Sequence, residues 1–475
     1  MMRPRLSLMA ASLALALAGC ALGPDYQRPQ AAIELPAAYA EGAQAPADSP
    51  ALASQWWTLF GDAQLNQLVS QALAGSPDAR SAAARIEEAE ALLRQVDAAL
   101  LPQVDLSATG AHTRYSQTTA VKTPNAASIR DSAKLNLATS FELDVWGKLR
   151  RSSEAAQAQF LGTRYAAETV YLSLAASVTQ SYLSLRALDA QLALARDNLE
   201  SQTQITRLTE KRQQGGIASA LDVEQARSTL ASYRSTAATL AQRRAVALSQ
   251  LGLLVGQPGL QVAEGDLKGL PLPPEPPVGL PSSLLEARPD LRKAETDLIA
   301  ANAKIGVAKA ALFPGITLTG SFGRESKDLA QLFSAPSAIW SLGAGITQPI
   351  FEGGRLRARV EEVSAQQKQS LEAYRKAVQT AFREVNDALV TLHASAETEA
   401  AQQQTLDAAR RTRDLTRLRH ASGYAAYADV LAAERSSNEA AQTWLDRRQA
   451  RLSAAVDLFK ALGGGWKDER LLMQR

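Results

Sequence analysis

The chain contains the stretch SPDARSAAARIEEAEALLRQVDAALLPQVDL at residues 76–106 and a second version of it, RPDLRKAETDLIAANAKIGVAKAALFPGITL, at residues 288–318. Both stretches place Pro-Asp near the start, continue with a helical pattern and stop at a proline that follows an apolar residue. Their prolines align at an offset of 212 residues, as for Pro77 and Pro289. A self-similar chain indicates a repeated structural unit, so we expect each half to build the same elements.

The similarity continues further along the chain. WGKLRRSSEAAQAQ from Trp146 aligns with GGRLRARVEEVSAQ from Gly353, at an offset of 207 residues. At the same offset, GIASALDVEQAR from Gly216 aligns with GYAAYADVLAAE from Gly423. Each half therefore has the expected order helix, strand, strand, long helix, turn, helix.

The repeats divide most of the chain into expected parts. The first repeat spans residues 56–256 and the second spans residues 284–462. Residues 257–283 join them as a linker, because its many prolines forbid a continuing helix. A C-terminal tail follows at residues 463–475.

Each repeat contains two segments of alternating apolar and polar residues, expected as hairpins at 104–145 and 316–351. Alternation over about ten residues is typical of a transmembrane strand with one face to lipid and one to water. A soluble hairpin with one face on a core gives the same pattern. Four strands cannot close a barrel wide enough to hold water, and an open edge is forbidden in lipid. If these strands span a membrane, several protomers must share one barrel.

Long helices should follow the hairpins. No proline interrupts the chain from about Lys148 to Gln213, and at about 1.5 Å per residue such a helix is on the order of 100 Å long. Its apolar stripe keeps an average spacing of 3.5 residues, which predicts left-handed coiled-coil packing. The stripe begins with Ala167, Tyr171, Leu174, Val178, Ser181 and Leu185. Tip turns are expected at 214–221 and 421–428.

The tip turns contain glycines and are followed by carboxylates. Gly216 and Gly423 can adopt the positive φ that a sharp reversal requires. Asp222 and Asp429 follow near the start of the returning helices, where a carboxylate suits the helix dipole. Helix capping alone could explain both carboxylates.

The only cysteine lies in LALALAGCALGPDYQRP, residues 13–29, behind a basic start and an apolar run of signal-peptide length. Leu17-Ala18-Gly19-Cys20 resembles the bacterial lipobox. That resemblance implies removal of a signal peptide at residues 1–19 and acylation of Cys20. The alternative is an ordinary buried cysteine in a secreted protein.

Acylation would leave residues 20–55 as a lipidated, extended N-terminal segment. A diacylglycerol thioether and an N-acyl chain on Cys20 carry enough apolar carbon for stable membrane anchoring. Ala21, in place of an aspartate, implies sorting to the outer membrane of a Gram-negative bacterium. No cofactor is expected apart from this covalent lipid.

Composition excludes several functional classes. The 51 Lys and Arg residues nearly balance the 48 Asp and Glu residues, so nucleic acid is not an expected partner. The three histidines have no ligand spacing and the single cysteine is already assigned, which excludes a zinc site of the usual Cys/His kind. Neither a phosphate-binding glycine loop nor a nucleophile elbow is present. The chain is therefore not expected to be an enzyme, and no catalytic or metal-binding residue is predicted.

Several motifs together resemble the TolC-like outer-membrane efflux family, most closely its OprM-type (NodT) lipoproteins. They cover essentially the whole mature chain: Cys20-Ala-Leu-Gly-Pro-Asp-Tyr-Gln-Arg-Pro29, Trp56-Trp57 with Phe60 and Asp62, Ala287-Arg-Pro-Asp-Leu-Arg292, Leu312-Phe313-Pro314, Phe351-Glu-Gly-Gly-Arg355 and Leu462-Gly-Gly-Gly-Trp466.

The resemblance implies a membrane α+β fold with two structural repeats per chain. It implies a homotrimer in which each protomer gives four strands to one shared β-barrel, continued through the periplasm by a long α-helical coiled-coil barrel. A periplasmic adaptor (membrane fusion protein) and an inner-membrane transporter of the resistance-nodulation-division type would complete the pump.

The resemblance also assigns the tips a role in adaptor contact and in narrowing the periplasmic aperture. The residues implied are Gly216, Leu221, Asp222, Val223, Gly423, Tyr427, Asp429 and Val430. Ala425 and Ala432 stand where some family members have a latch arginine and a second aspartate. The closed mouth is therefore hypothesised to rely on apolar contacts of Leu221 and Tyr427.

The expected function is passive exit of small hydrophobic or amphipathic compounds, from the periplasm to the exterior, with opening caused by docking. A protein-secretion duct of the same family and a lipid-anchored coiled-coil scaffold are the alternatives. The four alternating segments argue against the scaffold. The sequence does not identify the transported compound.

Overall fold

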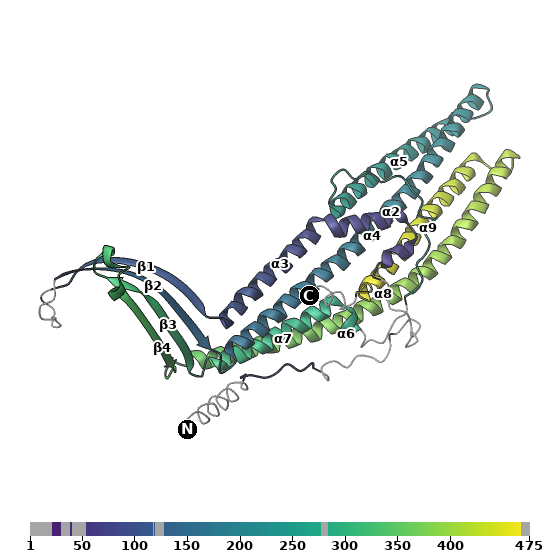
Figure 1. Cartoon of the computed structure of the whole chain (residues 1–475). Helices are drawn as coiled ribbons and strands as arrows, with labels where there is room; N and C mark the ends of the chain where they lie inside the picture. Colours follow the sequence, from purple (N-terminus) through teal and green to yellow (C-terminus); the bar gives the residue numbers. More distant parts are fainter. Residues whose placement is uncertain are drawn as a thin grey trace. The chain divides into compact units, whose positions relative to one another are not determined.

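The computed structural model describes residues 21–29, 39, 54–116, 118, 128–276 and 284–466. Most of these residues are helical, and four strands form one sheet (Figure 1). The elements in chain order are η1 (Trp56–Phe60), α2 (Ala63–Gly75), α3 (Pro77–Asp97), η2 (Ala98–Leu100), β1 (Gln103–Arg114), β2 (Ile129–Leu143), α4 (Lys148–Gln214), α5 (Ala220–Val255), α6 (Leu284–Ala287), α7 (Pro289–Ala310), β3 (Gly315–Ser326), η4 (Leu329–Gln331), η5 (Ala335–Ser337), β4 (Ala338–Thr347), α8 (Arg355–Ala421) and α9 (Tyr427–Ala461).

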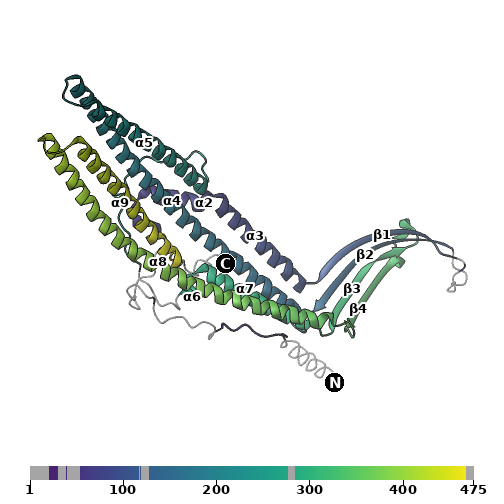
Figure 2. The same cartoon turned by 180° about the vertical axis from the view of Figure 1, so that it is seen from behind.

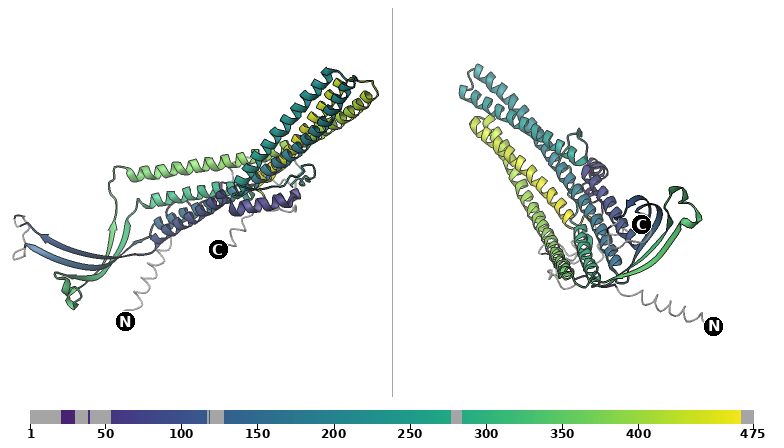
Figure 3. Two further views of the ribbon diagram at one scale, coloured as in Figure 1. Left: turned by 90° about the horizontal axis from the view of Figure 1, so that it is seen from above. Right: turned by 90° about the vertical axis from the view of Figure 1, so that its left-hand side faces the viewer.

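The expected order of elements occurs twice. The series α3, β1, β2, α4, α5 is followed by α7, β3, β4, α8, α9. Helices α4 and α8 have 67 residues each, which corresponds to about 100 Å at about 1.5 Å per residue. In every view α5 runs back along α4, and α9 runs back along α8 (Figure 1, Figure 2 and Figure 3).

The chain divides into two compact units. One contains the N-terminal segment with Ile86–Thr163 and Ala294–Tyr374, and therefore the whole sheet. The other contains Ala31–Arg85, Arg164–Lys293 and Arg375–Arg475, and therefore both tip turns.

The sheet is antiparallel with the order β1-β2-β3-β4. Its register places apolar residues opposite apolar residues across all four strands: Leu106 opposes Leu137, Leu137 opposes Phe322, and Phe322 opposes Trp340. Residues opposite each other point to the same face, so this row is continuous. All four side chains are exposed in the protomer, Trp340 by 74%. The alternation predicted from the sequence therefore gives one apolar face and one polar face.

The main core of the second unit lies around η1, α2 and the middle of α4. Trp56 and Phe60 are fully buried, and the ring of Trp56 stacks on Phe459 with centroids 5.4 Å apart. Asp62 caps α2 by accepting hydrogen bonds from the Gln64 and Leu65 backbone amides. The Trp-Trp motif thus anchors the start of the first repeat against the end of the second.

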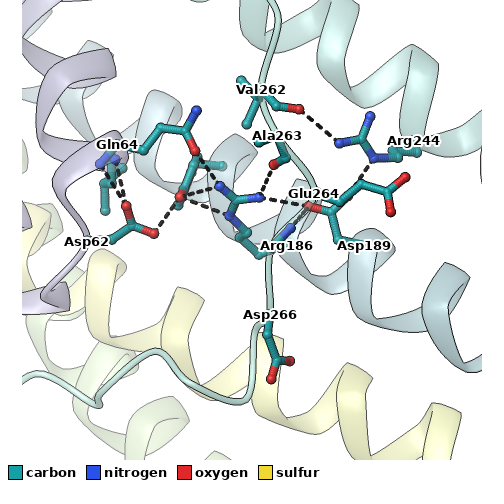
Figure 4. Close-up of polar contacts among 12 residues, drawn as sticks. Asp62, Gln64, Arg186, Asp189, Arg244, Val262, Ala263, Glu264 and Asp266 are labelled. Carbon is teal, nitrogen blue, oxygen red and sulfur yellow. Dashed lines mark hydrogen bonds and ion pairs between the residues drawn. The ribbon is translucent and has the colours of Figure 1, made fainter.

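A buried polar network docks the linker on α4 (Figure 4). The Asp189 carboxylate accepts hydrogen bonds from Arg186 Nη1 at 2.8 Å, Arg244 Nε at 2.5 Å and the Gly265 amide at 3.0 Å. Arg186 Nη1 also donates to the Ala263 carbonyl at 2.7 Å. Gly265 permits this approach, because a Cβ there would lie 2.5 Å from Arg186 Nη1.

The same network reaches α2. The Tyr182 hydroxyl donates to the Asp62 carboxylate and accepts from Arg186. Burial raises the pKa of the Tyr182 phenol, so it stays protonated and able to donate. Arg186 thus joins α2, α4 and the linker.

Among the helices of the described ranges, none has the length and apolarity needed to cross a membrane.

Candidate functional site at the helical tips

The first tip is a short reversal between α4 and α5. Gly216 has φ +75°, and the Ile217 amide donates to the Arg212 carbonyl at 2.8 Å. The left-handed residue lets the chain satisfy the last carbonyls of α4 while it turns. A Cβ on Gly216 would meet open space, so its backbone conformation is the reason for glycine here.

A capping box starts the returning helix α5. The Ser219 hydroxyl accepts from the Asp222 amide, and the Asp222 carboxylate accepts from the Ser219 amide at 2.9 Å. The Ser219 hydroxyl also donates to Asp222 Oδ2 at 2.8 Å. These bonds, the backbone one first, lower the pKa of the Asp222 carboxyl. Asp222 is therefore ionised and engaged at the helix start.

The second tip repeats this geometry, but it has only one of the two hydrogen bonds of the capping box. Gly423 has φ +81°, and the Tyr424 amide donates to the Arg419 carbonyl at 2.8 Å. The Asp429 carboxylate accepts from the Ala426 amide at 3.0 Å. Alanine offers no side-chain acceptor, so the reciprocal bond of the first tip cannot form here. Both aspartates thus act as helix caps, and their role at an aperture stays a prediction.

The remaining predicted tip residues separate into two groups. Val223 and Val430 are buried, and each packs inside its hairpin as a core residue. Leu221 is 66% exposed. Tyr427 is half-buried, and burial raises the pKa of its phenol, with Gln202 and Thr209 of α4 beside it. Tyr427 therefore lies against the first hairpin, and the proposed latch by Leu221 and Tyr427 remains a prediction.

Sequence reasoning missed two exposed apolar residues at the turns. Ile217 is 81% exposed and Tyr424 is 78% exposed, directly after the two tip glycines. They occupy equivalent positions of the repeat, 207 residues apart. An apolar side chain repeated inside both reversals was the available signal. Exposed apolar groups of this kind indicate a binding surface when they gather.

An ion pair closes each hairpin behind its tip, with reversed polarity. In the first hairpin Arg227 Nε lies 3.0 Å from Glu210 Oε1, and in the second Arg417 Nη2 lies 2.7 Å from Glu434 Oε1. At the offset of 207 residues, Glu210 corresponds to Arg417 and Arg227 corresponds to Glu434. Both residues of the pair changed together, so the attraction was kept in each hairpin.

The described residues contain no group of three or more His, Cys, Asp or Glu side chains able to hold a metal ion. Cys20, the predicted acylation site, lies outside the described residues. The tips thus combine capped helix starts, exposed apolar side chains and ion-paired hairpins.

The sequence profile of outer membrane efflux proteins matches residues 68–257 and 280–464. The chain belongs to this family. It is 37% identical over 460 residues to the cation efflux system protein CusC of Escherichia coli O6:H1, which covers 96% of this chain and 98% of CusC. It is 37% identical over 424 residues to the pyoverdine export outer membrane protein OpmQ of Pseudomonas aeruginosa, covering 88% of each chain.

A solved structure gives the same assignment. The outer-membrane channel OprN matches with a TM-score of 0.84 and 30% identity, over 94% of this chain and all of OprN. The predicted family and fold class, a membrane α+β protein with two repeats, are confirmed. The chain is an outer-membrane efflux channel component and not an enzyme.

Proposed function

We propose that the chain is the outer-membrane duct of a tripartite efflux pump and conducts small hydrophobic or amphipathic compounds passively from periplasm to exterior. A periplasmic adaptor and an inner-membrane resistance-nodulation-division transporter are its partners. One observation carries the proposal: each repeat joins two strands of an exposed apolar face to a 67-residue helix that ends in a capped reversal.

The sheet supports a trimer. Strands β1 and β4 are its edges, and both leave backbone donors and acceptors for further pairing. In lipid those groups must be satisfied, which a closed ring of strands achieves. Three copies give twelve strands, and pairing β4 of one protomer with β1 of the next closes the ring.

The junction of sheet and helices has the aromatic residues expected at a membrane–water interface. Trp146 precedes α4, and its Nε1 donates to the Pro314 carbonyl at 2.8 Å. Its ring lies 4.9 Å from the ring of Phe313. Tryptophan gathers at this depth because it is apolar with one polar handle. We therefore assign the strands to the membrane and the long helices to the periplasm.

The N-terminus fits a second membrane attachment. We infer cleavage after residue 19 and acylation of Cys20, with residues 20–55 as the lipidated segment. The four strands of each protomer already hold the trimer in the membrane, so the lipid serves targeting and assembly more than retention.

The tips are the proposed docking surface for the adaptor. Ile217 and Tyr424 are exposed at corresponding places of the two hairpins, so a trimer presents six such side chains. Burying them against adaptor hairpins would remove apolar area from water, which favours the complex. The caps at Asp222 and Asp429 hold these turns in one conformation before docking.

Small organic compounds are the proposed substrates, although CusC is named for cations. Of the four methionines, Met1, Met2 and Met9 lie in the signal peptide, which leaves Met473 in the mature chain with Cys20 and three histidines. Soft cations prefer thiolate, thioether and imidazole ligands. The mature chain therefore has few side chains that could hold a soft cation on its way through the duct.

The test is complementation of a Gram-negative strain that lacks its own channel but keeps adaptor and transporter. The double variant Ile217→Ser, Tyr424→Ser should form heat-modifiable trimers but fail to restore resistance to hydrophobic dyes. Ser422→Ala in the same turn is the control and should restore it. Full resistance with the double variant would overturn the docking surface. Protection by the unaltered chain against metal cations only would overturn the substrate class.

A further inference from the structure

Residues 21–29 form an extended strap that lies across the start of α4 and along α7. At its first end the Leu22 amide donates to the Trp146 carbonyl at 3.1 Å. Arg151 Nη2 donates to Asp25 Oδ1 at 2.5 Å. The Arg151 side chain is only 8% exposed, so the strap supplies a carboxylate to a guanidinium group that is almost completely buried.

The rest of the strap is held by α7 of the second repeat. The Asn302 amide group donates to the Pro24 carbonyl at 2.7 Å. Arg28 donates two hydrogen bonds to Glu295, at 2.6 Å and 2.8 Å, in the bidentate geometry that is strongest for this pair. The Tyr26 hydroxyl donates to the same carboxylate at 3.2 Å. The strap therefore supplies three hydrogen bonds to a buried carboxylate.

Three glycines let the strap backbone approach this closely. A Cβ on Gly306 would lie 2.6 Å from the Leu22 carbonyl oxygen, and a Cβ on Gly23 would lie 2.6 Å from Gly306 Cα. A Cβ on Gly147 would lie 2.8 Å from Ala21 Cα. A side chain at Gly147 or Gly306 would fill the seat of the strap, and a side chain at Gly23 would keep the strap out of it.

Among the residues that the structure describes, the seat occurs in one of the two repeats, which indicates that it is specific. At the offset of 212 residues, α3 has Ala83, Glu90 and Arg94 where α7 has Glu295, Asn302 and Gly306; at the offset of 207 residues, α8 has Ala358 where α4 has Arg151. Gly354 corresponds to Gly147 and has the same positive φ, yet nothing lies within 4 Å of its added Cβ. Duplication alone would have produced two seats.

We propose that this seat is a binding site for the chain's own processed N-terminus, which clasps α4 of the first repeat to α7 of the second. The occupant is recognised as an extended peptide with a small residue, an aspartate and an arginine at the positions of Gly23, Asp25 and Arg28. The clasp sets the position of the strand–helix junction beside Trp146.

The clasp also fixes where the lipid enters the membrane, a step that rests on the proposed acylation. Cys20 is joined by one peptide bond to Ala21, which contacts Gly147 next to Trp146. Acyl chains attached there begin at the aromatic junction, at the depth of the lipid headgroups. The seat of the strap, and not the lipid, therefore sets the position at which the acyl chains enter the membrane.

The experiment measures hydrogen exchange of the Leu22 amide in the purified, detergent-solubilised full chain. Gly147→Ala should speed exchange about tenfold or more, since the strap must leave its seat. Gly354→Ala has the same backbone strain without a strap contact and should leave exchange unchanged. Equal exchange in the two variants would overturn the clasp.

Charge reversal guards against a variant that merely misfolds. Arg28→Glu should speed exchange of the Leu22 amide, and adding Glu295→Arg should restore slow exchange. Failure of the second change to restore it would refute recognition by this ion pair. Cys20→Ala should keep the strap protected; loss of protection there would mean that the lipid holds the strap. None of these readouts depends on efflux, so the clasp and the proposed function fail independently.

Discussion

Replacing Asp189 by asparagine tests the buried network that attaches the linker to α4. The Asp189 side chain is 1% exposed and accepts from Arg186, Arg244 and the Gly265 amide. Asparagine keeps the shape but removes the negative charge. Two guanidinium groups then remain close together with no carboxylate between them.

The expected loss is large because a buried charge loses its partner. Breaking a buried ion pair costs about 3–5 kcal/mol. Arg186 is 6% exposed and cannot reach water, whereas Arg244 is 15% exposed and can in part. We therefore expect the lower end, about 3 kcal/mol. Unfolding entropy is about 2.1 cal/mol/K per residue, so a chain of 475 residues shifts by about 1 °C per kcal/mol, and the midpoint of thermal unfolding should fall by roughly 3 °C.

The assay is thermal unfolding of the detergent-solubilised protein, followed by helical circular dichroism. Glu264→Gln is the matched control, because Glu264 pairs with Arg196 nearby at 2.8 Å with both side chains about half exposed. Such a surface pair is worth about 0–1 kcal/mol. If Asp189→Asn lowers the midpoint no more than Glu264→Gln, the network does not hold the linker as argued.

Three further predictions concern the tips and the N-terminus. Gly423→Ala should destabilise only its own turn, by roughly 1–2 kcal/mol of backbone strain, seen as faster amide exchange at that tip beside an unchanged Gly216 tip. Folding lowers the Asp222 pKa, so the stabilisation from this carboxylate is complete above the unfolded pKa of about 3.9 and is lost as pH falls through the folded pKa. Amide exchange at the start of α5 should therefore become faster in acid, and Asp222→Asn should abolish that rise. Cys20→Ala behind a cleavable signal should still give trimers that restore efflux, and complete loss of membrane association would contradict it.

The fold was largely predictable because its signals are periodic. Alternation with period two fixed which residues share a sheet face, and the register agrees, with Leu106 opposite Leu137 and Phe322 opposite Trp340. The proline-free runs predicted α4 and α8, and Gly216 and Gly423 lie in the reversals. Such local patterns depend only on neighbours along the chain, so a single sequence contains them.

The contacts that hold the linker and the N-terminal strap were not predictable in the same way. Asp189 meets Arg244 across 55 residues, and Arg28 meets Glu295 across 267 residues. A polar residue on a long helix is predicted to be solvent-exposed when its partner, distant in the sequence, is not known. Ile217 and Tyr424 were missed for the opposite reason, since apolar residues are usually expected inside.

The two repeats differ where the protomer needs one attachment and not two. Both have long helices and capped turns because a duct wall needs them all round. Arg186 and Asp189, which dock the linker, correspond to His393 and Ala396, because one linker joins two halves. The seat of the strap likewise occurs once, because a chain has one N-terminus. The ion pairs behind the tips show the contrasting case: each hairpin needs its own closure, so the polarity reversed while the pair survived in both. Divergence between the halves therefore separates parts that serve the wall from parts that serve the single chain.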